Sequence, residues 1–599
     1  MKLFKNIKRL GQGFSETILR FPITVIFLVA ATITEAVSIQ QEHNSSSDLI
    51  LTFVMGAALS IVLQMVYERF FKDKLERYIG MGLSLVLTFC FFVYVKVQES
   101  DIQLSIQTAV IFFILFIAFL WIPVIKSRIN FNESFLATFK AFFTATFFEG
   151  VLFLGLILII GAIDILIVET DYKLYLHFAN IIFALFAPVQ FLSLIPYYPG
   201  KRNMEELKVE NKADLEQSEE KNVIDMKSEN LLRFTSPGRF LETLITYIIL
   251  PITAVFTIIL LIYIIANIRQ DFWTDNLMEP LLISYSITVI LVYLLASTLN
   301  NTMARLFRSI FPKVLVPIVL FQVVASLLKT REVGITYGRY YVIMFGIFAV
   351  ISGVIFCFKS VHKNGLIAPV LIVLSLISIL PFVNAFTLSR EVQENRLQKV
   401  LEQNNMLVGQ KVVPRPEISK NDKEIIISSI EYLEEVDAID RISWLSEYKK
   451  SQNFEVTFGF SEYEDIGKNQ FRSIYRDTRT PIPVEGYDYM MRTYINEENE
   501  QMLIEDSVVG GNTFSLYKEG NELILKDLAG EALHFSIDQL YDKASKVEEY
   551  DTNLDTQELI FTEENSTTRL TVIADNITID LDSDNNEIQA DIYVLIDFK

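Results

Sequence analysis

Three carboxylates lie in apolar stretches, where an ionisable side chain is costly and therefore often functional. Glu35 lies in the first apolar stretch, and Glu149 and Asp164 share the fifth. At about 100° per residue, the separation of Glu149 and Asp164 puts both carboxylates near one face of a helix. At about 1.5 Å per residue they are roughly 22 Å apart along it, which excludes a paired-carboxylate site and permits a relay of protons or cations.

Each of these carboxylates also has a structural interpretation. Glu35 and Asp164 lie close to the ends of their stretches, where a carboxylate can reach water at the membrane surface. Glu149 could instead form a buried ion pair with Lys140. His177 begins the sixth stretch, and because the chain has only four histidines, we expect a structural role for it and no cluster of metal ligands.

A short loop between two later apolar stretches combines arginines with glycines. Its glycines permit sharp turns and a close approach of the backbone, and its arginines could hold a phosphate or carboxylate with paired hydrogen bonds. The alternative is that the arginines anchor the loop at the membrane surface, or pair with carboxylates and lock the bundle. The candidate residues of this loop are Arg331, Gly334, Thr336, Arg339 and Tyr340.

One acidic run near the C-terminus resembles the register of a calcium-binding loop. Asp580, Asp582 and Asp584 occupy positions one, three and five, and Asp591 occupies position twelve. The departures are an asparagine, Asn585, where such loops have glycine, an aspartate in place of the bidentate glutamate, and flanks that resemble strands. A polar β-hairpin turn is therefore the favoured interpretation, and Ca²⁺ is the one cofactor that the sequence suggests.

Other catalytic signatures are missing from the sequence. It has no phosphate-binding loop, zinc-protease helix or dinucleotide fingerprint, and no nucleophile in a recognisable setting, so the sequence favours a protein that is not an enzyme. The two cysteines, Cys90 and Cys357, both lie in apolar stretches. The polar C-terminal part therefore has no disulfide framework and no thiolate metal site.

The elements that must position these residues are mainly apolar helices. The chain is 51% apolar, and a helix needs about 20 apolar residues to cross a bilayer. We predict a polytopic α-helical membrane bundle of about eleven transmembrane helices, followed by a soluble α+β C-terminal domain. The predicted spans are Phe21–Ile39, Leu49–Tyr67, Tyr78–Val95, Leu104–Ile125, Phe142–Val168, Leu174–Ile195, Leu244–Ala266, Leu281–Leu299, Val314–Leu328, Tyr341–Phe358 and Gly365–Phe386.

The distribution of basic residues predicts an orientation. Lysines and arginines concentrate in the N-terminal tail and in alternate loops, which favours a cytoplasmic N-terminus in the plasma membrane. The exception is the loop that holds Lys329, Arg331 and Arg339. Eleven crossings then place the C-terminal domain outside the cytoplasm.

The net charge divides the chain into two parts. From Arg390 to Lys599 there are 21 basic and 44 acidic residues, a net charge of −23. Such a domain stays soluble and repels nucleic acid, so a nucleic-acid partner is excluded and the bilayer is the expected partner of the apolar part.

Five segments follow from these patterns. They are a six-helix membrane half (1–196), a charged cytoplasmic linker (197–240), a five-helix membrane half (241–387), a juxtamembrane helix (388–412) and an acidic extracytoplasmic α+β domain (413–599). The two membrane halves share no evident sequence repeat, so the inverted-repeat argument for transporters has no support.

The C-terminal domain shows both helical and alternating patterns. Helices are predicted at Ile425–Val436, with Asn421 or Asp422 as its cap, and at Ile537–Val547. Glu519, Gly520 and Asn521 predict a hairpin turn. Alternation predicts strands at Phe454–Phe460, Thr513–Tyr517, Glu522–Lys526, Arg569–Ala574, Ile577–Leu581 and Ile588–Phe598.

Several motifs in the membrane part resemble a bacterial multi-pass membrane protein family known as domain of unknown function 4153. The likeness spans about residues 15–435 and departs from the family at Val333, where tyrosine is usual. It implies a multi-pass plasma-membrane protein and no assigned activity. The motifs that carry it are Tyr247–Pro251 with Tyr263, Arg331–Tyr340, Asn384–Leu401 and, more weakly, Arg20–Pro22.

Three functional hypotheses remain. The first is a cell-envelope binding or sensing protein, whose external domain takes an envelope ligand or protein partner while the helix bundle anchors and positions it. The second is a transporter or lipid-handling protein that uses the intramembrane carboxylates and the Arg331–Tyr340 loop. The third is a membrane enzyme that acts on lipid-linked substrates.

Overall fold

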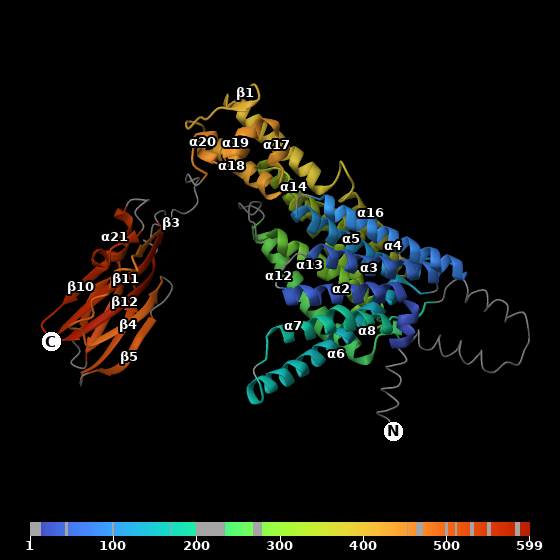
Figure 1. Ribbon diagram of the computed structural model, residues 1–599, viewed down its shortest axis with the longest axis horizontal. Coiled ribbons are helices and arrows are strands. Elements are labelled where there is room, and N and C mark those ends of the chain that lie inside the picture. The colour runs from blue at the N-terminus through green and yellow to red at the C-terminus, as the bar shows by residue number, and fades with distance from the viewer. Residues whose placement is uncertain are drawn as a thin grey trace, which may run out of the picture. The chain divides into compact units, whose positions relative to one another are not determined.

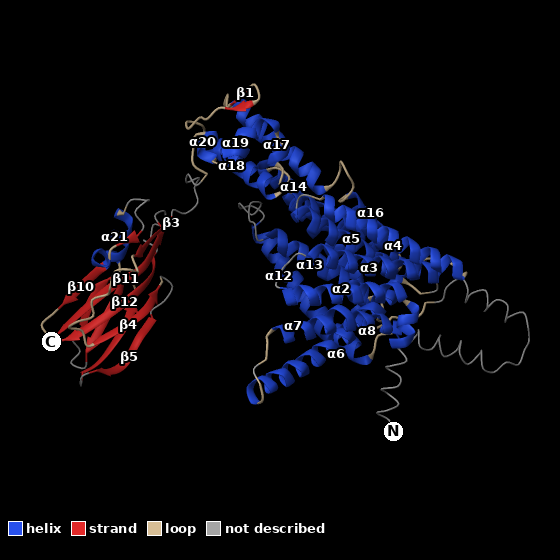
Figure 2. Cartoon of the chain, in the orientation of Figure 1, coloured by secondary structure: helices blue, strands red, loops and turns tan. Residues whose placement is uncertain are grey.

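The computed structural model forms two compact units, Met1–Gly459 and Phe460–Lys599. Helices make up the first unit and strands dominate the second (Figures 1 and 2). The structure describes residues 14–41, 46–98, 101–127, 129–168, 170–198, 234–267, 278–451, 453–462, 471–496, 501–509, 512–527, 532–547, 553–580 and 588–599.

Within these described residues, ten helical segments are long and apolar enough to cross a membrane. Two of them, the sixth and the seventh, are each built from two α-helical pieces joined by a π-helical turn. The helices are α2 (Pro22–Gln41), α3 (Ser47–Phe70), α4 (Lys74–Val97), α5 (Asp101–Trp121), α6 (Phe131–Leu166), α7–η3–α8 (Lys173–Asn180, Ile181–Phe186, Ala187–Leu194), α11–η4–α12 (Arg239–Leu244, Ile245–Ile249, Leu250–Asn267), α13 (Met278–Ala296), α14 (Thr302–Val333) and α15 (Tyr337–Phe358).

A shorter apolar segment follows the ten long helices. After α15 the chain forms the short helices η6 (Val361–Leu366) and α16 (Ile367–Ile377). Beyond them, the carbonyl of Val383 accepts a 2.9 Å hydrogen bond from the hydroxyl of Tyr340, in the first turn of α15. The chain has therefore returned to the end of the bundle where α15 begins. The ten long spans are close to the predicted number of about eleven.

Two helices are longer than their apolar cores. Helix α6 has 36 residues, or about 54 Å at 1.5 Å per residue, and α14 extends the short predicted span Val314–Leu328 at both ends. The reason lies in the caps, which the apolar pattern does not reveal. Asn130 and Asn301 accept hydrogen bonds from backbone N–H groups in the first turns of α6 and α14, and Gly334 ends α14 at a φ of +79°.

Glycines bring α14 and α15 close together. A side chain at Gly353 would place its Cβ 2.7 Å from Cγ2 of Val316, and one at Gly346 would overlap Cγ2 of Val323. Both glycines are buried. They are seven residues apart on α15, and the two valines that they face are seven residues apart on α14. Small residues at this spacing permit the tight helix packing that membrane bundles use.

Helices six and seven share an irregularity. In each, a proline lies two residues after the last residue of a π-helical turn. The N–H of Ala187, before Pro188, donates to the carbonyl of Ile182, and the N–H of Leu250, before Pro251, donates to the carbonyl of Ile245. A π turn contains one residue more than the helix around it requires.

The chain beyond the last span stays with the membrane helices. The compact unit Met1–Gly459 extends past residue 413, where the sequence predicts the start of the C-terminal domain. The predicted strand Phe454–Phe460 is wrong, because Phe454–Phe458 is a helix that Asn453 caps. The rings of Phe454 and Phe458 lie one turn apart, with their centroids separated by 4.6 Å. The elements here are α17 (Ala385–Gln403), β1 (Leu407–Val408), β2 (Lys411–Val412), α18 (Lys420–Glu435), η7 (Ile439–Arg441), η8 (Ser443–Leu445), α19 (Ser446–Ser451) and α20 (Phe454–Phe458).

The second unit contains two sheets with a shared core, and all their strand pairs are antiparallel except β3 with β9. The strand order is β4-β12-β11-β3-β9 in one sheet, with β10 also paired to β11, and β5-β6-β7-β8 in the other. The strands and the helix α21 are β3 (Phe471–Arg476), β4 (Tyr489–Ile495), β5 (Gln501–Val509), β6 (Asn512–Glu519), β7 (Glu522–Asp527), β8 (Ala532–Ser536), α21 (Asp538–Lys546), β9 (Asn553–Leu554), β10 (Ile560–Glu564), β11 (Thr568–Asp580) and β12 (Ile588–Phe598).

The predicted hairpin turn and the predicted helices of the C-terminal part are confirmed. Gly520, at a φ of +55°, and Asn521 join β6 to β7, and α18 and α21 match the two predicted helices, although Ser419 caps α18. The two predicted strands Arg569–Ala574 and Ile577–Leu581 are one strand, β11. Its pairing with β12 shifts register between Ala574 and Asn576, so the break in alternation is a β-bulge.

Candidate functional site

The intramembrane carboxylates lie in different surroundings. Glu35 is half-buried near the end of α2. Asp164 is exposed, and its carboxylate accepts hydrogen bonds from the N–H and hydroxyl of Thr170, just beyond α6. Glu149 is 0% exposed, and no described residue forms a hydrogen bond with either of its oxygens. Lys140 instead donates to the carbonyls of Phe234 and Ser236.

The glycine-framed loop connects α14 to α15. Thr336 caps α15, and Arg339 donates to the carbonyls of Lys329 and Gly334, closing the end of α14. Arg331 is exposed. The structure thus brings Gly334, Thr336, Arg339 and Tyr340 together in a packed connection, in which Arg339 has a structural role.

This loop also contacts the helices that follow the last span. Gln393 of α17 donates to the carbonyls of Val333 and Ile335. The Tyr432 hydroxyl of α18 donates to Ser389 over 2.6 Å and accepts the N–H of Tyr337 over 2.9 Å. We call Gly334–Tyr340 with Ser389, Gln393 and Tyr432 the α15–α17–α18 joint.

Positive charge gathers beside this joint. Burial lowers the pKa of Arg396 from its ordinary value, and the nearby Arg339 lowers it further. The Arg396 guanidinium donates to the carbonyl of Val333 over 2.9 Å. The basic side chains here therefore bond to backbone carbonyls at the end of α14, and their first effect is to hold that helix end in place.

The calcium hypothesis is not tested by the structure. Asp582, Asp584 and the side chain of Asp580 lie outside the described residues. Asp591 is described, and it lies on β12 with a carboxylate oxygen 4.0 Å from Arg492. In the part of the chain that the structure describes, no three metal-ligating side chains lie together.

Asp591 belongs instead to a polar cleft of about 400 Å³ on the outer face of the six-stranded sheet. The bulge in β11 creates it, because Asp575 is the extra residue and Asn576, which follows it, pairs with Asp591 and Tyr475 on the two neighbouring strands. We call it the Asp575 cleft. Its lining residues are Tyr475, Arg476, Asp477, Thr478, Arg479, Arg492, Asp575, Asn576 and Asp591.

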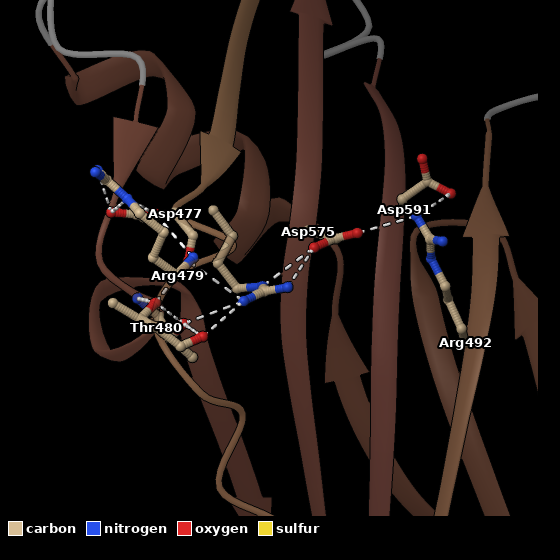
Figure 3. A network of polar contacts seen from close by, with 8 residues as sticks. Asp477, Arg479, Thr480, Arg492, Asp575 and Asp591 are labelled. Atoms are coloured by element: carbon tan, nitrogen blue, oxygen red, sulfur yellow. Dashed lines mark hydrogen bonds and ion pairs between the residues drawn. The ribbon is translucent and has the colours of Figure 1, made fainter.

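Asp575 lies between two guanidinium groups (Figure 3). One oxygen accepts from Nε and Nη2 of Arg476, at 3.1 and 2.9 Å, and the other accepts from Arg492 at 2.9 Å. The ring of Tyr593 lies 5.9 and 5.6 Å from the two guanidinium carbons. Arg476 is buried while Arg492 is exposed, so one arginine fixes Asp575 and the other faces solvent.

The floor of the cleft is held by a second set of contacts. Nη1 of Arg476 donates to the carbonyl of Thr480 at 3.1 Å, and the hydroxyls of Thr480 and Thr556 are hydrogen-bonded to each other. Hydrogen bonds from the side chain and then the backbone of Arg479 lower the pKa of Asp477 below its ordinary value. Asp477 therefore stays charged at neutral pH.

This arrangement can bind a polar molecule. Guanidinium and hydroxyl groups offer donors, and carboxylates offer acceptors. The side-chain oxygen of Asn576 is buried without a hydrogen-bond partner among the described residues, and it lines the cleft. A buried acceptor that lacks a donor is costly, so a ligand N–H or O–H would be stabilised there.

The sequence does not reveal this cleft. Its patterns suggest Asp591 only as a calcium ligand, and Asp575 lies on a strand far along the chain from those of Arg476 and Arg492. A weak signal existed, because Asp575 and Asn576 interrupt the alternation between two predicted strands. Such an interruption in a long strand is typical of a bulge, and bulges are frequent beside functional sites.

The membrane part has a recognisable family. The sequence model of a family described as Domain of unknown function (DUF4153) matches residues 23–417, which include most of the α15–α17–α18 joint and end before α18. Neither a curated protein nor a solved structure matches the chain. Since the matched region covers well over half of its length, this multi-span membrane protein belongs to the DUF4153 family, a family of unknown function.

Proposed function

We propose that the chain is a cell-envelope binding protein, in which the helix bundle anchors a C-terminal unit that binds a glycan-like ligand in the Asp575 cleft. The observation that carries this proposal is the bulge at Asp575, which turns two adjacent polar residues outward and holds Arg492 at the mouth of a 400 Å³ cleft. An extracytoplasmic position of this unit, as the distribution of basic residues favours, would give it access to the envelope.

The lining chemistry supports a ligand rich in hydroxyl and amide groups. Planar guanidinium, carboxylate and amide groups can each make paired hydrogen bonds to neighbouring hydroxyls of a sugar. Tyr475 contributes a half-exposed ring to the same cleft. A phosphate-rich ligand is less suitable, because Asp477, Asp575 and Asp591 offset the three arginines of the lining.

The test is a titration of the full-length protein in lipid nanodiscs with soluble glycan fragments released from bacterial cell walls by a muramidase. We expect Arg492→Ala to weaken binding at least tenfold by calorimetry. Arg569→Ala is the matched control, because Arg569 pairs with Asp597 at 2.8 Å on the same sheet and does not line the cleft. No heat with the unchanged protein, or equal losses in both variants, would refute the proposal.

A second candidate function, lipid handling, is favoured by one groove. Within the membrane spans, α5, α15 and α16 border a groove of about 360 Å³ with a mostly apolar lining. The hydroxyls of Tyr341, Ser375 and Ser378 are its polar groups, so it could hold an acyl chain beside a polar linkage. Neither Glu149 nor the arginines of the 331–340 loop line it.

Photo-crosslinking tests this second candidate. A phospholipid with a diazirine in its acyl chain should label α5 or α16 in nanodiscs, and Ala109→Trp should remove most of that labelling by filling the groove. Leu158→Trp, at a 74% exposed position of α6, is the control. Labelling that is spread evenly over the lipid-facing helices, or unaffected by Ala109→Trp, would exclude a lipid site here.

A further inference from the structure

Lys518 is a buried lysine that points toward the apolar interior of the C-terminal unit. In β6, Phe514, Leu516 and Lys518 alternate on the inward face, and Lys518 is only 5% exposed. Directly opposite on β7 is Leu523, which is fully buried. We find neither an ion pair nor a hydrogen bond of its ammonium group with any described residue.

A cationic side chain with so little exposed area is poorly hydrated. Such a group gains from an anionic ligand that approaches it from the side of the pocket. Strands sometimes carry an inward charge to prevent association of sheet edges. However, β6 is not an edge strand, because it pairs with both β5 and β7.

The lysine lines a pocket of about 320 Å³, whose residues come from both sheets and from the segment before α21. Its apolar wall consists of Ile495, Ile537 and Ile588, all buried. Asn496, Gly520 and Asn521 form the polar part of the lining, and the side chain of Asn521 also holds Asp538. The pocket is thus apolar on one side, with a single cationic group.

We propose that this pocket binds a small organic carboxylate with an apolar body. The carboxylate would accept a charge-assisted hydrogen bond from Lys518 and neutralise it, and the apolar body would pack on the three isoleucines. Lysine acts as a point charge and does not impose the paired geometry of an arginine, which suits a monoanionic group. This site is separate from the Asp575 cleft, with which it shares no lining residue.

The first test measures binding directly. Full-length protein in an amphipathic polymer is titrated with hexanoate and, separately, with 1-hexanol, which has the same chain length and no charge. We expect saturable binding of hexanoate, at least tenfold weaker binding of hexanol, and at least a tenfold loss of hexanoate affinity in Lys518→Met. Lys518→Arg should retain most of the affinity, and Arg492→Ala should not change it. Equal binding of hexanol, or an unchanged affinity in Lys518→Met, would overturn the proposal.

A second measurement uses the unchanged protein, so it does not depend on the folding of a variant. Lysine acylation followed by mass spectrometry reports how accessible each ammonium group is. Hexanoate should slow the modification of Lys518 at least threefold and leave Lys526, an exposed lysine of the neighbouring strand β7, unaffected. Slowing of both lysines, or of neither, would show that hexanoate does not bind at this pocket.

Discussion

At the scale of single residues, a well-buried ion pair of the membrane part joins Arg20 to Glu68. Two bonds of 2.9 and 2.8 Å link the guanidinium and carboxylate groups, and Arg20 also donates to the carbonyl of Ile195 at the end of helix six. The rings of Phe21 and Tyr197 lie 4.9 and 5.1 Å from its guanidinium carbon. Arg20 therefore connects the segment just before α2, helix α3 and the end of helix six.

Glu68→Ala should destabilise the protein strongly. It leaves the Arg20 charge buried without its carboxylate, which costs about 3–5 kcal/mol for a buried pair. The loss can be measured as a lower midpoint of thermal aggregation by size-exclusion chromatography. Asp48→Ala is the control, because Asp48 and Lys96 form a pair with side chains 41% and 54% exposed, and such pairs contribute about 0–1 kcal/mol. Similar midpoints for both variants would contradict this account.

At the scale of elements, the packing of α14 on α15 depends on glycine. Gly346→Ala should lower the thermal midpoint, because Val323 meets the added methyl group and a β-branched side chain in a helix has little rotamer freedom. Overpacking of this kind costs about 1–3 kcal/mol. Gly82→Ala should be neutral or stabilising, since nothing lies within 4 Å of its Cβ position and alanine favours helix.

A compensating change separates packing from other effects. If the clash with Val323 is the cause, the double variant Gly346→Ala with Val323→Ala should recover much of the lost stability. No recovery would mean that the glycine acts in another way, for example through backbone flexibility. The same double-variant design applies about two helical turns away, at Gly353 and Val316.

The membrane-spanning helices could be predicted from the sequence, because they are recognised by the length of their apolar stretches. The ten long apolar helices were all anticipated, because hydrocarbon thickness sets helix length. Helix ends were less predictable, since Asn130, Asn301 and Gly334 act through hydrogen bonds and backbone angles that an apolar pattern does not contain. The strand predicted at Phe454–Phe460 failed because a short apolar run fits either period, and packing against Tyr448 decided for a helix.

The candidate site was less accessible to prediction than the helices. Among the sequence candidates that the structure describes, Asp591 alone lies in the Asp575 cleft, and it lies there beside an arginine. The cleft depends on which strands are neighbours, and β11 is far along the chain from β3 and β4. Gly334, Thr336, Arg339 and Tyr340 did come together, because they lie within one short segment, but the contacts of this segment with α17 and α18 depend on tertiary packing.

At the scale of the whole molecule, the side of the membrane that holds the C-terminal unit can be tested by labelling. In a background without Cys90 and Cys357, Lys546→Cys places a thiol at a position with a 75% exposed side chain. We expect this thiol to react with a membrane-impermeant maleimide on intact cells, because eleven crossings from a cytoplasmic N-terminus end outside. Reaction only after lysis would reverse the orientation and remove the basis for an envelope ligand.

The two π-helical turns affect how the bundle can tolerate changes in chain length. Deleting one residue from a regular helix rotates everything beyond it by about 100°, which in a membrane exchanges lipid-facing and buried side chains. A π turn already holds one surplus residue, so its loss restores a regular helix and leaves both flanks facing as before. Helices six and seven can therefore each absorb a single deletion, for example of Ala184, whereas deletion of Leu291 in α13 should abolish folding. At these two turns the chain can therefore lose a residue without changing which side chains of the helix face lipid and which are buried.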